Sequence, residues 1–146
     1  MTLQRMDNVL IVVEDLERVT AFFVELGMEL EGEAPIEGPS VDRLNAIDGI
    51  RVDIAMMRVP GSSDGVELTR FHTPAAVGAD RAAAPPNALG LRSVMFAVDD
   101  VDDTVARLRA HGAELVGSVE QFEQGYRLAY VRGPAGIIVA LAEELS

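Results

Sequence analysis

Residues 6–32 read MDNVLIVVEDLERVTAFFVELGMELEG, and residues 91–117 read LRSVMFAVDDVDDTVARLRAHGAELVG. The second stretch aligns with the first without a gap, at a constant offset of 85 residues. Eight positions are identical, namely Val9/Val94, Val13/Val98, Asp15/Asp100, Ala21/Ala106, Gly27/Gly112, Glu29/Glu114, Leu30/Leu115 and Gly32/Gly117. Such a repeat indicates a structural unit that occurs twice in the chain.

Each copy predicts a strand that leads into a helix. The runs Val9–Val13 and Val94–Val98 are apolar throughout, which is typical of strands covered on both faces. Asp15 and Asp100 follow these runs, where a carboxylate caps a helix, and the apolar residues beyond them keep helical spacing. The glycines expected to end the two helices, in a left-handed conformation, are Gly27 and Gly112.

The later part of each half predicts two further strands. They cover Arg51–Val59 and Gly65–Phe71 in the first half, and Tyr126–Arg132 and Gly136–Leu145 in the second. Pro and Gly stand between the strands of each pair, which indicates a hairpin turn.

Two stretches show no regular pattern. We expect residues 33–49 to be an irregular insertion, in which Pro39 to Arg43 form either a lid over a binding site or an ordinary surface loop. Residues 72–90 are rich in Ala and Pro and predict a linker between the halves.

The composition is that of one ordinary globular domain. The 146 residues are 49% hydrophobic and include no cysteine, which excludes disulfides and thiolate zinc sites. A formal net charge of -12 opposes binding to nucleic acid or to anionic lipid. No apolar run reaches the roughly 18 residues of a membrane span, and the first residues lack a signal-peptide pattern. We therefore expect a cytoplasmic protein with no membrane or nucleic-acid partner.

This order of elements, with its duplication, resembles the vicinal oxygen chelate superfamily of glyoxalases, bleomycin-resistance proteins, extradiol dioxygenases and methylmalonyl-CoA epimerases. The resemblance covers essentially the whole chain, and its most specific segments are residues 7–30, 93–115 and 133–144. It implies one α+β domain over residues 1–146, with two tandem βαβββ modules that form a curved mixed sheet around a funnel. The modules would cover residues 6–71 and 91–146, with the helices outside and the active site inside. On family grounds we expect a homodimer.

The resemblance also implies where a metal would bind. Metal-binding members use a His or Gln at the head of the first strand and a Glu in the last strand of each module. The four corresponding residues here are Asn8, Glu67, Ser93 and Ala140. Because only Glu67 is a strong ligand, we expect no cofactor; if a divalent zinc, nickel, manganese or iron ion binds, Glu67, Asn8 and His72 would hold it. His72 is otherwise an ordinary surface residue beside a turn.

Strand alternation predicts which side chains surround Glu67. Those expected to share its side are Asn8, Leu10, Val12 and Thr69, with Ser93, Met95, Ala97, Ala140 and Ala142 from the second module. A carboxylate on such an apolar wall suits a general base, or an anchor for a cationic or hydrogen-bond-donating ligand. Alternatively, Glu67 bonds to an Arg or Tyr and has only a structural role.

Other residues predict the lining of the same site. Tyr126 and Tyr130 lie on one face of their strand and Arg127 on the other, so either phenols or a guanidinium would face the ligand. Core packing is the alternative role for the tyrosines. Met56 and Met95 would form adaptable walls for an apolar ligand, or would be ordinary core.

Two functions fit these expectations. The first is a glyoxalase-like enzyme in which Glu67 moves a proton next to a carbonyl, in an isomerisation, epimerisation or lyase reaction, with an incomplete metal site. The second is a metal-free protein of the bleomycin-resistance type that sequesters a small molecule, mostly apolar or cationic. The loss of the family ligands at Asn8, Ser93 and Ala140 counts against metal chemistry and is neutral for binding.

Overall fold

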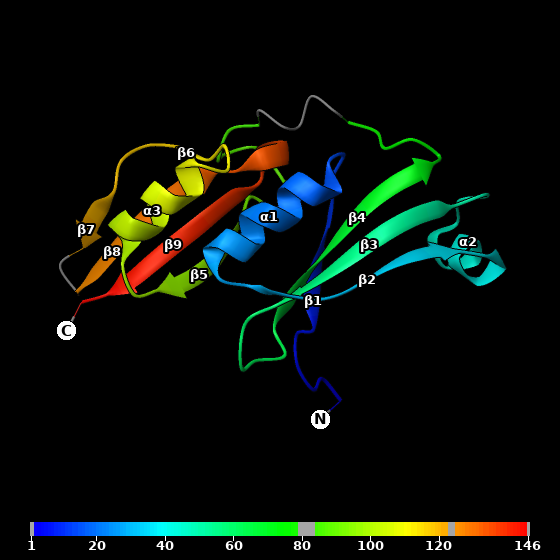
Figure 1. Ribbon diagram of the computed structural model, residues 1–146, viewed down its shortest axis with the longest axis horizontal. Coiled ribbons are helices and arrows are strands. Elements are labelled where there is room, and N and C mark those ends of the chain that lie inside the picture. Colours follow the sequence, from blue (N-terminus) through cyan, green and yellow to red (C-terminus); the bar gives the residue numbers. More distant parts are fainter. Residues whose placement is uncertain (1, 79–83, 123–124, 146) are drawn as a thin grey trace. The chain divides into compact units, whose positions relative to one another are not determined.

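The computed structural model describes residues 2–78, 84–122 and 125–145. The chain divides after Gly78 into two compact units, and each unit carries one sheet (Figure 1). Part of the predicted linker, residues 79–83, lies outside the described residues. Among the described residues, no helix is long and apolar enough to cross a membrane.

The first unit is a βαβββ module with one additional helix. Its elements are β1 Asn8–Val12, α1 Leu16–Leu26, β2 Glu29–Glu37, α2 Pro39–Asn45, β3 Arg51–Arg58 and β4 Gly65–Thr73. The strands are ordered β1-β4-β3-β2, and β1 runs parallel to β4 while the other pairs are antiparallel.

The second unit repeats this topology. Its elements are β5 Ser93–Val98, α3 Val101–Arg109, β6 Glu114–Leu115, β7 Glu120–Phe122, β8 Tyr126–Arg132 and β9 Ile138–Glu144. The order is β5-β9-β8-β6, β5 is parallel to β9, and the short β7 also pairs with β8. The prediction of an α+β fold built from two tandem βαβββ modules is therefore confirmed.

The helix caps follow the sequence pattern. The Asp15 carboxylate accepts a hydrogen bond from the Arg18 backbone N–H at 3.0 Å, and Asp100 accepts from Asp103 N–H at the same distance. Gly27 ends α1 with a φ of 124°. In the second unit α3 ends at Arg109, and the predicted Gly112 follows with a φ of 85°, where the Ala113 N–H donates to the Leu108 carbonyl at 3.2 Å.

Each long helix covers one face of its own sheet. Helix α1 packs against β2, β3 and β4, where its buried Phe22 and Phe23 rings meet edge to face with their centroids 5.2 Å apart. Helix α3 packs against β6, β8 and β9. We call the opposite face of each sheet its open face.

The expectation that the first strand of each module is covered on both faces was wrong. On the open faces, Leu10 of β1 is 52% exposed and Met95 of β5 is 55% exposed. The reason is geometric: alternate residues of a strand point to opposite faces, and the helix covers only one of them.

The expectation of an irregular insertion at residues 33–49 was also wrong. Strand β2 continues to Glu37, which pairs with Arg51, and α2 follows with Pro39 at its start. The Asp42 carboxylate then accepts hydrogen bonds from Gly49 and Ile50 N–H, both at 2.9 Å. The continuation of β2 beyond Gly32 was not apparent from the sequence because β2 is an edge strand with mostly exposed, acidic residues and little apolar alternation.

Candidate functional site

Glu67 lies in the middle of the open face of the first sheet. In register it stands between Leu10 of β1 and Met56 of β3. Its neighbours along β4, Val66 and Leu68, are buried on the side of α1, so the Glu67 side chain points away from the helix. This register places Glu67 and Leu10 on the same face of the sheet, as strand alternation predicts.

Thr69 is the hydrogen-bond partner of Glu67. The Thr69 hydroxyl donates to Glu67 Oε2 at 3.2 Å, and Thr69 is itself buried while Glu67 is half-buried. No arginine or tyrosine among the described residues bonds to this carboxylate. A carboxylate has about four acceptor positions, so Glu67 keeps acceptor capacity for a ligand.

His72 pairs with an aspartate of the neighbouring strand. Its Nε2 lies 2.7 Å from Asp53 Oδ2. Asp53 is adjacent to Ile54, which is opposite Thr69, and adjacent residues of a strand point to opposite faces. Asp53 therefore projects on the side of the sheet away from the Glu67 carboxylate, and the structure pairs His72 with Asp53 rather than with Glu67.

The register of the second sheet identifies the counterparts of these residues. Ala140 of β9 stands between Met95 and Tyr130, as Glu67 stands between Leu10 and Met56. In the same way, the exposed Ser93 begins β5 as the exposed Asn8 begins β1. The alanine is fully buried between its larger neighbours.

The open face of the second sheet presents phenols rather than a guanidinium. Tyr126 and Tyr130 are exposed on it, whereas Arg127 points to the helix side. There its Nη1 and Nη2 donate to the two carboxylate oxygens of Asp102 in α3, at 2.8 and 3.1 Å. Hydrogen bonding to Arg127 lowers the pKa of the Asp102 carboxyl, and the same bonds raise the pKa of Arg127.

Phe122 is a residue of this face that the sequence pattern did not identify. It lies in the three-residue strand β7 and pairs with Tyr126, so both rings are on the same side of the sheet. The sequence does contain a signal for a turn here, because Gly125 lies between Phe122 and Tyr126, two aromatic residues four positions apart.

The residues at the four family ligand positions do not fit a metal. Ala140 has no donor atom, Ser93 offers a neutral hydroxyl and Asn8 an amide, which leaves Glu67 as the single carboxylate. In the described parts of the chain, no group of three or more His, Asp or Glu side chains is arranged to hold a metal ion.

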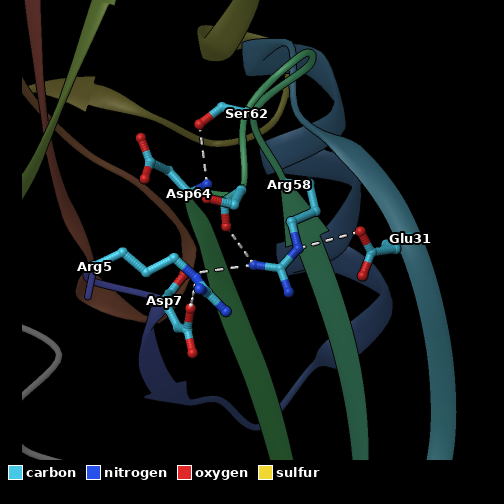
Figure 2. Close-up of polar contacts among 7 residues, drawn as sticks. Arg5, Asp7, Glu31, Arg58, Ser62 and Asp64 are labelled. Carbon is cyan, nitrogen blue, oxygen red and sulfur yellow. Dashed lines mark hydrogen bonds and ion pairs between the residues drawn. The ribbon is translucent and has the colours of Figure 1, made fainter. Parts of the chain in front are cut away.

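Arg58 closes one end of the open face of the first sheet (Figure 2). Its Nε donates to Glu31 Oε2 at 3.2 Å, and its Nη1 donates to the backbone carbonyls of Ser63 and Asp7 at 2.8 and 3.4 Å. In the second unit, Arg132 likewise donates to two carbonyls, of Gly136 and Ala84. These arginines are engaged in structural hydrogen bonds.

Comparison with known proteins gives one family and several similar folds. The family model described as the Glyoxalase/Bleomycin resistance protein/Dioxygenase superfamily matches residues 5–141. A glyoxalase family protein from Bacillus cereus is 50% identical, with a TM-score of 0.95, over 100% of this chain and 97% of that one. A search of curated proteins found no match.

Two more distant structures share the fold. A glyoxalase I mutant from Zea mays is 18% identical, with a TM-score of 0.67, over 93% of this chain and 44% of that one. An antibiotic binding protein from Streptomyces sp. CB03234 is 21% identical, with a TM-score of 0.63, over 99% of this chain and 98% of that one.

Proposed function

Because the chain belongs to the glyoxalase/bleomycin resistance protein/dioxygenase superfamily, we propose that it binds a small organic molecule, without a metal, on the open face that carries Glu67. The observation that supports this proposal is a half-buried carboxylate beside exposed apolar side chains of β1, with a hydroxyl as its partner. Glu67 would anchor a cationic or hydrogen-bond-donating group of the ligand. The ligand would otherwise be mostly apolar.

The apolar residues around Glu67 supply the remaining affinity. Leu10 and Val12 of β1 are both about half exposed, and Met56 flanks the carboxylate on the other side. Covering the exposed half of a Leu or Val side chain contributes about 1 kcal/mol.

Proton transfer is the second candidate function. The amide of Asn8 lies on the same face as Glu67 and has no hydrogen-bond partner among the described residues. Glu67 would remove a proton from the carbon next to a carbonyl, and the Asn8 amide would donate to the oxygen as its charge grows. The protonated Glu67 would then return the proton, which corresponds to an isomerisation, epimerisation or lyase reaction.

The proposal also includes a cytoplasmic, homodimeric protein organised as one domain. Sedimentation equilibrium measures the mass of the assembly directly.

Metal analysis and a ligand screen test the proposed function. We expect tag-free protein to contain no stoichiometric metal and to show no change in Tm on addition of zinc, nickel, manganese or iron(II). A library of small carbonyl compounds and amines should contain molecules that raise the Tm of the wild type but not of Glu67→Gln. Glu33→Gln is the matched control, since it removes the same charge from an exposed site in β2.

Three outcomes would contradict parts of this proposal. A stoichiometric metal that is lost in Glu67→Ala would overturn the metal-free reading. Ligands that raise the Tm of Glu67→Gln as much as that of the wild type would show that Glu67 does not contribute to ligand binding. Conversion of a bound carbonyl compound, detected by proton exchange with deuterated water, would establish the second candidate over simple binding.

A further inference from the structure

Three aromatic side chains are exposed on the open face of the second sheet. Phe122 is 52%, Tyr126 43% and Tyr130 42% exposed. Neither tyrosine hydroxyl has a hydrogen-bond partner among the described residues. Exposure of aromatic rings to water is unfavourable in free energy, and a group of them on one face indicates a binding surface.

The positions of neighbouring residues establish which way this face points. Arg127, next to Tyr126, bonds to Asp102 of α3, and Glu143 accepts a hydrogen bond from Val101 N–H at the start of the same helix. Adjacent residues of a strand point to opposite faces. The side chains of Tyr126 and Glu144 therefore project away from α3.

Phe122, Tyr126 and Glu144 form one row across three strands. Tyr126 of β8 is directly opposite Phe122 on one side and Glu144 of β9 on the other. Cross-strand neighbours of this kind have their Cβ atoms about 4.5–5.5 Å apart. The row therefore places two rings and a carboxylate side by side on one surface.

The backbone around Gly125 holds this row together. Gly125 N–H donates to the Phe122 carbonyl at 3.0 Å, and the Gly125 carbonyl accepts from Leu145 N–H at 2.6 Å. Gly125 has a φ of +87°, and a Cβ there would lie 3.3 Å from the Leu145 carbonyl oxygen. A glycine is thus required where β7 and the end of β9 meet β8.

We propose that Phe122, Tyr126 and Glu144 form a binding site for an organic cation, of the quaternary ammonium class. Ring faces attract a cation through their quadrupole, and the Glu144 carboxylate adds a full negative charge. No arginine in the described residues pairs with Glu144, because Arg127 is engaged by Asp102 and Glu143 on the other side of the sheet. The net charge of -12 further favours a cationic ligand.

This site goes beyond the proposed function, since all of its residues belong to the second sheet and Glu67 belongs to the first. It is also distinct from the position in the second sheet that corresponds to Glu67. Glu144 is four residues along β9 from Ala140, which is about 13 Å in an extended strand. The two sites can therefore be tested separately.

Choline and its neutral isostere 3,3-dimethyl-1-butanol test this inference on the full chain. In a nuclear magnetic resonance titration, choline should shift the amide signals of Phe122, Tyr126 and Glu144 in a saturable way. The isostere should bind at least about fivefold more weakly, since it lacks the cation–π and carboxylate attraction. Equal binding of the two compounds would overturn the inference.

Single variants separate the ring and charge contributions. Tyr126→Ala and Glu144→Gln should each weaken choline binding by about three- to fivefold, whereas Tyr126→Phe keeps the ring and should bind as the wild type does. Glu33→Gln removes a charge from the first sheet and should have no effect. The Tm of each variant confirms that it is folded, and the titration of Glu144→Gln provides the decisive comparison if Tyr126→Ala does not fold.

The outcome also distinguishes this site from the one at Glu67. The contrary result is that choline shifts the amide signals of Leu10 and Thr69, with an affinity that falls in Glu67→Gln but not in Glu144→Gln. In that case the cation binds at the proposed ligand site, and the inference is overturned. If the affinity falls in Glu144→Gln alone, the inference is supported whether or not the ligand screen at Glu67 succeeds.

Discussion

The side chain of Arg58 lies across Gly65, the residue opposite it in the neighbouring strand. A Cβ at position 65 would lie 2.6 Å from Arg58 Nη1 and 2.5 Å from the Met57 carbonyl oxygen. Without that Cβ, the guanidinium passes over β4 and reaches the Asp7 carbonyl on its far side. Glycine is therefore required here by the Met57 carbonyl oxygen and by the arginine side chain that crosses it, not by its own backbone conformation.

Gly65→Ala should destabilise the protein by about 1–3 kcal/mol, because the added methyl group overlaps a backbone oxygen as well as the arginine. Thermal or urea unfolding measures the loss. Gly32→Ala is the matched control, since nothing lies within 4 Å of a Cβ at that position in β2. Equal stability of the two variants would show that Arg58 and the backbone yield to the methyl group at little cost.

The two helix caps should contribute similarly to the free energy of unfolding, since each aspartate accepts a hydrogen bond from one backbone N–H at 3.0 Å. Asp15→Ala and Asp100→Ala are each expected to lower the free energy of unfolding by about 1 kcal/mol. Asp99→Ala, one residue before the second cap, should have little effect. A loss for Asp99→Ala as large as that for Asp100→Ala would argue against capping as the cause.

The bond between Asp102 and Arg127 should make stability depend on pH in acid. Arg127 lowers the pKa of Asp102 below its ordinary value of 3.8, so the folded state binds this proton less readily than the unfolded chain does. The stabilisation is therefore present above pH 3.8 and disappears as the pH falls through the lower pKa of the folded state. Asp102→Asn should lower Tm slightly at neutral pH, and the difference from the wild type should vanish in strong acid.

Glu114→Gln is the control for that measurement, because this exposed carboxylate in β6 has no partner among the described residues. A Tm difference between Asp102→Asn and the wild type that persists unchanged into strong acid would mean that the ion pair is not its source.

The loop after α2 should depend on one carboxylate. Asp42 accepts hydrogen bonds from both Gly49 and Ile50 N–H, and hydrogen bonds to a charged group contribute about 1.5–3 kcal/mol. Asp42→Ala should therefore speed amide hydrogen exchange at these two residues well beyond any change elsewhere in the unit. Asp48→Ala, in the same loop and without a described partner, should leave both rates unchanged.

Much of the fold was predictable because its signals are local. The repeat, the strand runs and the capping aspartates each depend on residues close together in the chain, and the predicted span of β8, Tyr126–Arg132, was confirmed. The continuation of β2 beyond Gly32 and helix α2 were missed because an exposed acidic edge strand has little apolar alternation, and because Asp42 caps residues seven and eight positions away.

The candidate site was predictable only in part. Alternation along β4 already indicates that Glu67 and Thr69 share a face, and it separates Tyr126 from Arg127 within β8. The face that the helix covers becomes apparent only in the fold, where the Asp102 carboxylate of α3, 25 residues earlier in the chain, engages Arg127. Likewise, the pairing of His72 with Asp53 follows from the register of β3 against β4.

The sequence by itself therefore determined the two modules and the order of their main elements, because these follow from short-range pattern. The family resemblance added that Glu67 is the single acidic residue at the expected metal-ligand positions. Only the tertiary structure decided the partner of His72, the orientation of Tyr126 and the place of Phe122 beside it. Backbone hydrogen bonds between distant segments, and helix packing on one face, determine which residues are cross-strand neighbours. These interactions do not produce a pattern at a fixed spacing in the sequence.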